Sequence, residues 1–145
     1  MLKRLFKPAM IAAAALAVQP ALAQETEAPA AKLGLELNSL APTENGCRVT
    51  FVISNAMGAE IENAAFEIAL FDQDRMVDRL TVIEFGELPA EKTKVSQFDF
   101  AGADCANIGR ILINGVTECN GAILDTQACG DALETTTRTN IEFGS

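Results

Sequence analysis

Apolar and polar residues alternate along several short stretches of the chain, which is the pattern of half-buried β-strands. The first stretch spans residues 33–38, and in the clearest one, residues 47–54, every second residue is apolar. Between them stands Asn45-Gly46, a dipeptide suited to a tight reversal with positive φ. The beginning of the pattern therefore predicts two strands joined by a turn.

The segment of residues 59–72 is ambiguous, because some of its apolar residues recur at helical spacing while those of residues 64–71 alternate. We favour a strand over residues 64–71, since residues 72–75 are a polar turn signal ahead of a second apolar run at residues 76–85. Residues 86–91, which include a proline, close that run.

Two further strands are expected in the second half of the chain. Residues 93–100 predict an irregular strand, since Val95 falls on the face opposite to the two phenylalanines, and a bulge or an imperfect register is expected there. Residues 108–116 are rich in β-branched side chains, and the Asn-Gly pair at 114–115 marks either a bulge or the end of that strand.

The C-terminal part adds a helical turn and a last strand. Asp125 and Gly130 are suited to begin and end one turn of helix at residues 125–130, and apolar or Thr residues alternate with others over residues 135–143. Seven strands at this spacing predict an all-β fold, an immunoglobulin-like antiparallel β-sandwich that comprises residues 33–145.

The first 23 residues have the three parts of a secretory signal peptide. Basic residues stand at positions 3, 4 and 7, an apolar stretch covers residues 10–18, and Ala21-Leu22-Ala23 precedes the expected cleavage site. An amphipathic helix kept in the mature protein is disfavoured, because the stretch is apolar on every face. Residues 24–32 lack hydrophobic periodicity and are expected to form a disordered leader. We expect a periplasmic or secreted protein with no membrane span in its mature chain.

The charge of the chain is strongly acidic. Its 145 residues include 20 acidic and 11 basic ones, a net charge of −9, and cleavage after residue 23 removes three of the basic residues and no acidic one, which gives −12. This charge argues against nucleic acid and anionic lipid as partners, since Lys and Arg bind their phosphates. It indicates solubility, or a surface that attracts cations or a basic protein.

The chain has no His, Trp or Tyr. Without His there is no Ser-His-Asp triad, no Cys-His pair and no His-ligated zinc. Four carboxylates, Glu60, Glu62, Glu84 and Glu87, are candidates for a hydrolytic pair, but nothing distinguishes any two of them from a solvated face. We therefore expect no enzyme activity, no catalytic residue and no cofactor.

Four cysteines, at positions 47, 105, 119 and 129, allow three disulfide connectivities in an exported protein. In an immunoglobulin-like strand order the second and sixth strands begin side by side, which favours Cys47–Cys105 and leaves Cys119–Cys129. Their spacing lacks the C-x-x-C pairs typical of zinc and redox sites.

Three carboxylates, Asp72, Asp74 and Asp78, resemble the start of a calcium-binding loop. The Gly and Glu that an EF-hand loop needs at its later positions are not matched. The three residues are the candidates for a metal site, and a hairpin turn is the simpler explanation for them.

One segment carries a family resemblance. Residues 68–72, Ile-Ala-Leu-Phe-Asp, with Ser54-Asn55 before them and Leu88-Pro89-Ala90 after them, resemble the FxLYD type of exported bacterial β-sandwich domain over residues 47–100. Leu70 and Asp72 match the motif, whereas Ile and Phe replace its Phe and Tyr.

The whole mature chain also resembles small periplasmic proteins of alphaproteobacteria that are labelled Tat pathway signal sequence domain proteins. Lys3-Arg4 stands where a twin-arginine signal carries two Arg, which favours Sec export. Both resemblances imply the fold and the compartment, and neither implies a catalytic residue.

These observations predict an exported, non-catalytic interaction or cell-envelope module whose partner is an envelope protein. Its binding surface is expected at an exposed strand edge or in the loop between Cys119 and Cys129. Because Trp and Tyr are absent, a weak or backbone-mediated interface is favoured over a strongly hydrophobic one. The alternative is a metal or small-ligand carrier that uses the acidic surface.

Overall fold

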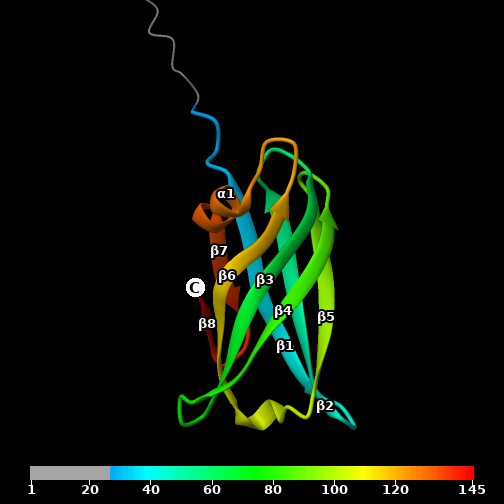
Figure 1. Ribbon diagram of the computed structural model, residues 1–145, viewed down its shortest axis with the longest axis vertical. Helices are drawn as coiled ribbons and strands as arrows, with labels where there is room; N and C mark the ends of the chain where they lie inside the picture. Colours follow the sequence, from blue (N-terminus) through cyan, green and yellow to red (C-terminus); the bar gives the residue numbers. More distant parts are fainter. Residues whose placement is uncertain (1–26) are drawn as a thin grey trace, which may run out of the picture.

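The computed structural model describes residues 27–145 of the protein (Figure 1). The predicted signal peptide and residues 24–26 of the predicted leader lie outside the described residues. Residues 27–31 are exposed and have no regular secondary structure, and the first strand begins at Lys32. Within the described part, no helix is both long and apolar enough to cross a membrane.

Strands dominate the structure, as the alternating pattern predicts, but residues 27–145 form eight of them and not seven. One short α-helix and one 3₁₀ helix accompany them. In chain order the elements are β1 (Lys32–Pro42), β2 (Gly46–Ala56), β3 (Ile61–Asp72), β4 (Val77–Leu88), β5 (Thr93–Ala101), η1 (Cys105–Asn107), β6 (Ile108–Asn120), α1 (Thr126–Asp131), β7 (Leu133–Thr137) and β8 (Glu142–Gly144).

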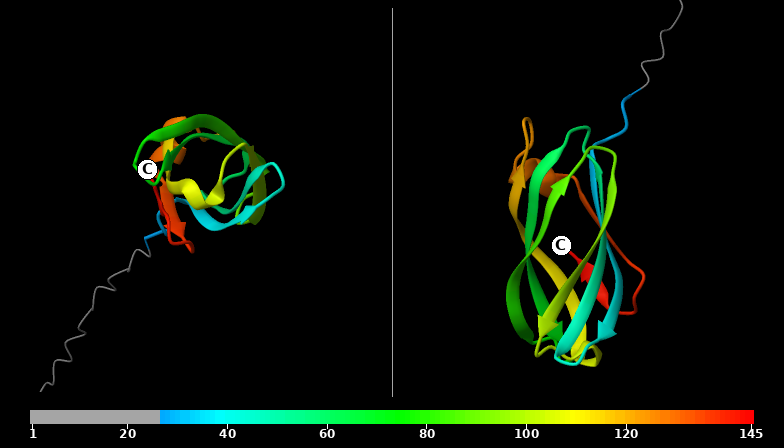
Figure 2. Two further views of the ribbon diagram at one scale, coloured as in Figure 1. Left: turned by 90° about the horizontal axis from the view of Figure 1, so that it is seen from below. Right: turned by 90° about the vertical axis from the view of Figure 1, so that its right-hand side faces the viewer.

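Two four-stranded sheets pack face to face, which confirms the predicted β-sandwich (Figures 1 and 2). One sheet has the order β5-β2-β1-β7 and the other the order β4-β3-β6-β8. Most neighbours are antiparallel, as expected. The prediction of a purely antiparallel fold is wrong for two pairs, because β1 runs parallel to β7 and β6 runs parallel to β8.

The prediction of a single last strand over residues 135–143 is wrong. It is divided into β7 and β8, which belong to different sheets. At the crossing, the Thr137 hydroxyl accepts a hydrogen bond from the backbone N–H of Thr139 (3.0 Å), and the Thr139 hydroxyl accepts one from that of Ile141 (3.3 Å). Such local side-chain bonds offer the backbone an alternative to ladder hydrogen bonds, and here they end β7.

The structure decides the two segments for which the sequence left alternatives open. The segment of residues 59–72 forms the strand β3, which lies at the centre of its sheet between β4 and β6. In β6 the register against β3 skips Asn114, so that the Asn-Gly pair marks a bulge, and the strand continues to Asn120.

The bulge expected in β5 is absent. Its register against β2 is continuous from Ala101 opposite Gly46 to Thr93 opposite Ser54. Val95 is exposed because it points to the outer face of its sheet, opposite to Phe98 and Phe100.

Two glycines also differ from expectation. Gly86 does not end the apolar run but lies within β4 at a register shift, where its φ of +68° is one that favours glycine. The reversal at Asn45-Gly46 is present, yet neither residue takes a positive φ. Gly46 is needed there for another reason, because a Cβ atom would overlap the carbonyl oxygen of Phe100.

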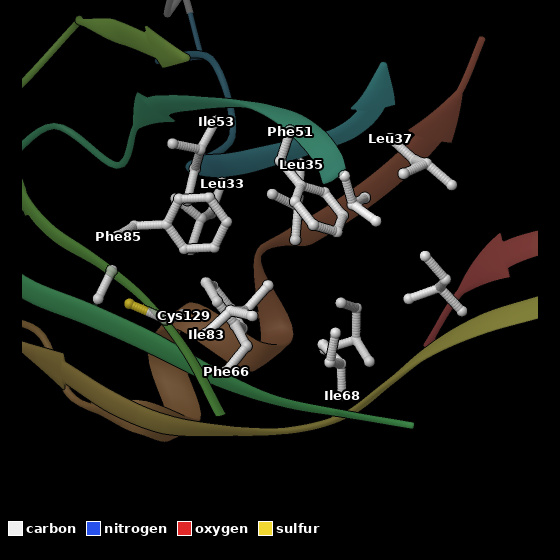
Figure 3. Packing of buried hydrophobic residues seen from close by; sticks show 14 of the residues in the cluster. Leu33, Leu35, Leu37, Phe51, Ile53, Phe66, Ile68, Ile83, Phe85 and Cys129 are labelled. Atoms are coloured by element: carbon white, nitrogen blue, oxygen red, sulfur yellow. The ribbon is translucent and has the colours of Figure 1, made fainter. Parts of the chain in front are cut away.

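Inward-facing Leu, Ile, Val and Phe side chains of both sheets fill the space between them (Figure 3). Phe51, Phe66, Phe85 and Phe98 form a chain of edge-to-face contacts with ring centroids 5.3–6.1 Å apart. Each large side chain buried in this way contributes about 2–3 kcal/mol relative to an exposed one. Contacts between these phenylalanines therefore connect the two sheets through the core.

Two disulfides complete the framework, with the predicted pairing. Cys47 lies near the start of β2 and bonds to Cys105 in η1, which directly precedes β6 in the facing sheet. Cys119 in β6 bonds to Cys129 in α1, the helical turn predicted from Asp125, whose side chain accepts the N–H of Ala128 (2.8 Å). Both bonds fit a periplasmic or extracellular compartment.

Candidate protein-binding site

The three candidate metal ligands serve the β3–β4 hairpin. Asp72 Oδ1 accepts the backbone N–H groups of Asp74 (2.9 Å) and Met76 (2.8 Å), and Asp78 pairs with Arg79 (3.1 Å). The structure thus supports the hairpin explanation for these carboxylates. Among residues 27–145, no three His, Cys, Asp or Glu side chains are grouped so as to hold a metal ion.

The four candidate hydrolytic carboxylates lie at the open surface. Glu60 and Glu62 stand at the start of β3, and Glu84 and Glu87 lie on β4. All four are exposed, and in the described part of the chain no hydrogen bond or ion pair involves their carboxylates.

A hollow of about 470 Å³ lies beside the β3–β4 hairpin and is open and mostly polar. Arg110 lines it, with its guanidinium 5.6 Å from the ring centroid of Phe71. The Nε atom of Arg110 is buried without a hydrogen bond, and its 3.5 Å separation from Glu142 Oε1 is an ion-pair distance. Arg110 thus stabilises the outer face of the sheet locally by cation–π and ionic contacts.

The most unusual surface lies along β4, the edge strand of its sheet. Its outward side chains include Leu80 and Val82, which are 58% and 48% exposed, and Met76 and Val77 are exposed just before them. We call these four residues the β4 strip. The outer face of an antiparallel sandwich sheet is ordinarily polar, so an apolar strip on a twelve-residue edge strand is unexpected.

Behind the strip, the outer face of the sheet is also apolar. Leu80 is paired across the ladder with Ala69 of β3, which is only 3% exposed although it lies outside the core cluster. Ala69 in turn is opposite Leu112 of β6. A band of apolar side chains therefore extends from the edge across three strands.

The β4 edge faces the edge of the other sheet, β5, at one side of the sandwich (Figure 1). Side chains bridge the two edges at both ends. Arg79 of β4 donates from Nη1 to the carbonyl oxygen of Ala101 (2.9 Å), and Lys94 of β5 donates from Nζ to that of Phe85. Charged side chains at an edge discourage unwanted pairing. The stretch of β4 between Arg79 and Phe85 carries no such bridge in the described structure.

Three carboxylates lie beside the apolar band, and we call them the carboxylate cluster. Glu67 of β3 is opposite Val82, whereas Glu84 of β4 and Glu118 of β6 flank Ala65 of β3 on either side. Glu67 and Glu118 accept hydrogen bonds from the side-chain amides of asparagines, and within residues 27–145 none of the three forms an ion pair. Along β4 the outer face therefore passes from the apolar Leu80 and Val82 to the carboxylate of Glu84 with increasing distance from the β3–β4 hairpin.

Comparison with known proteins yields no match: no family model, curated protein or solved structure is similar to the chain at a significant level. The resemblance to the FxLYD type, and that to alphaproteobacterial periplasmic proteins, stay predictions.

The β4 strip was missed in the sequence, although a signal for it is present. A half-buried strand alternates, whereas this run is apolar on both faces, with Leu80 and Val82 on one and Ile83 and Phe85 on the other. Such a run is usually a strand buried on both faces. Only the topology shows that it stands at an edge.

Proposed function

We propose that the protein is an exported interaction module of the cell envelope, and that it binds an extended segment of a partner protein along β4. The observation that carries this proposal is the β4 strip on an edge strand. An added strand gains backbone hydrogen bonds from the edge, and its side chains cover neighbouring apolar ones.

The remaining features of the surface support this mode of binding. The edge stretch between Arg79 and Phe85 is open in the described structure, and Leu80 and Val82 lie directly beside it. A chain without Trp or Tyr lacks the commonest anchors of a side-chain interface. Backbone pairing does not need such anchors, because main-chain groups supply much of the affinity.

The test is site-specific photocrosslinking in envelope preparations of the native host. A crosslinking amino acid at position 80 is expected to capture the same partner repeatedly, and Val82→Glu in the same protein is expected to abolish that capture. Ile123, which is 78% exposed between Cys119 and Cys129, provides the matched control for an apolar side chain at another surface.

If capture occurs equally at positions 80 and 123, or persists in Val82→Glu, the β4 strip is not the binding surface. Capture at position 123 alone would favour the loop between the second pair of cysteines. Thermal unfolding of each variant verifies that the fold is retained.

A further inference from the structure

The division of the outer face into an apolar band and a carboxylate cluster constrains what can pair with β4. In an added strand, residues opposite Leu80 and Val82 lie on the same face as these side chains, and so does the residue opposite Glu84. The two intervening residues point to the other face. The surface therefore specifies three alternate positions of a partner segment.

The first two of these positions must be apolar. The side chains opposite Leu80 and Val82 would cover surfaces that are about half exposed in the protein alone, and aliphatic or β-branched side chains do this best in a strand. A polar residue there would leave the apolar band in contact with water.

The third position must be basic. A side chain opposite Glu84 would lie within reach of Glu84, which has no cationic partner in the described structure, and Glu67, also without one, lies one strand farther away on β3. Opposite charges across a strand pair stabilise it, and like charges destabilise it by a similar amount.

We infer that the partner segment carries two apolar side chains at alternate positions and a Lys or Arg two positions beyond the one opposite Val82. This inference rests on the proposed function, and it adds the chemical class of the ligand: a basic, β-forming peptide segment. If the segment runs antiparallel to β4, the basic residue precedes the apolar ones in its sequence.

A second copy of the same chain is a poorer occupant. The antiparallel register that puts Leu80 opposite Val82 of the other copy also puts Asp78 opposite Glu84, so that carboxylates approach each other twice. The net charge of −9 adds a general repulsion between copies. Charge therefore favours a basic partner over self-association.

The probe is a synthetic peptide with the core lysine-threonine-valine-threonine-valine, and its control has glutamate in place of lysine. Fluorescence anisotropy with the disulfide-bonded protein should show the lysine peptide binding about tenfold more tightly than the glutamate peptide. Added salt should reduce this difference. Methylation of alternate peptide nitrogens should abolish binding, because it removes the donors needed for strand pairing.

A charge exchange makes the test specific. In Glu84→Lys the preference should reverse, so that the glutamate peptide binds more tightly. Glu44→Lys changes the net charge equally but lies in the β1–β2 turn, and it should keep the preference for lysine.

Equal binding of both peptides, or an unchanged preference in Glu84→Lys, would overturn the inference. So would sedimentation that shows a dimer disrupted by Val82→Glu, since the occupant would then be a second copy. Failure of the peptides together with successful crosslinking at position 80 would leave the proposed function intact. If neither peptide binds and no partner is captured at position 80, both the inference and the proposed function are wrong.

Discussion

Asn55 is a polar side chain in the interior, only 1% exposed, and all of its hydrogen-bonding groups are used. Its Nδ2 donates to the carbonyl oxygens of Ala59 and Leu88 (both 2.9 Å), and its Oδ1 accepts the N–H of Met57 (3.0 Å). Asn55 thus joins the end of β2 to the end of β4. A buried group that loses such a partner keeps the full cost of its desolvation.

Asn55→Leu is expected to lower the free energy of unfolding by about 2–4 kcal/mol, because it removes the partner of one buried carbonyl, one partly buried carbonyl and one buried N–H. Urea unfolding followed by circular dichroism measures this change. Asn140→Ala, at an exposed position, should change the free energy by less than about 0.5 kcal/mol. Equal effects of the two substitutions would contradict the role of Asn55.

Arg48 and Asp99 stand directly opposite each other on β2 and β5 and form two hydrogen bonds, of 2.7 and 2.9 Å. The hydrogen bond from Arg48, and then its charge, lowers the pKa of Asp99 below the ordinary value. A carboxyl whose pKa is lower in the folded state contributes stability above its unfolded pKa and loses it as the pH falls through the folded pKa.

Asp99 is therefore expected to titrate at lower pH than an ordinary aspartate, and Arg48→Met should bring its pKa back toward the ordinary range. NMR titration of the side-chain carboxyl carbon measures both. Because both side chains are exposed, the accompanying change in stability should be small. An unchanged Asp99 titration in Arg48→Met would show that the pair does not form in solution.

At the scale of elements, the two disulfides close loops of very different length. Cys47 and Cys105 are 58 residues apart in the chain, whereas Cys119 and Cys129 are 10 apart. The chain entropy lost by the unfolded state grows with loop length, which gives about 4 kcal/mol for the long loop and about 3 kcal/mol for the short one.

Replacement of both Cys47 and Cys105 by Ala is expected to destabilise the protein more than replacement of Cys119 and Cys129. Urea unfolding of the two double variants, with the remaining disulfide intact, measures the difference. The first pair also links β2 to η1, which directly precedes β6 of the facing sheet, whereas the second links α1 to β6. A larger loss from the second pair would mean that local packing of α1 outweighs chain entropy.

Local pattern was enough to predict most elements, and topology decided the rest. Alternation identified β1, β2 and the strand character of β3, and the expected strand order led to the correct cysteine pairs. Alternation continues through residues 135–143, so nothing in it indicates the change of sheet between β7 and β8. The candidate site was out of reach for the same reason, since Leu80 looks like a core residue until β4 is known to be an edge.

For the molecule as a whole, charge and burial act in opposite directions. The core favours the compact state, whereas an excess of nine negative charges favours expansion by mutual repulsion. Five ion pairs are present among the described residues, each with a partner that is at least half exposed, and such pairs contribute about 0–1 kcal/mol each. Repulsion is therefore expected to dominate the electrostatics.

The Tm is accordingly expected to rise by several degrees between very low salt and roughly 0.15 M sodium chloride, where the Debye length falls to about 8 Å. Differential scanning calorimetry at neutral pH measures this. A variant with Glu44→Lys and Glu60→Lys, both exposed, should begin with a higher Tm and gain less from salt. A fall in Tm with salt would mean that the surface ion pairs outweigh the repulsion.

The parallel pairing of β1 with β7 has a mechanical consequence. These strands lie near the two ends of the domain, and Leu33 to Leu37 pair in register with Leu133 to Thr137. A pull on the two ends, once β8 has detached, draws the paired strands past each other along their length. The bonds between them are then loaded together and must fail together, not one by one. A domain held at both ends would in this way keep its fold under tension.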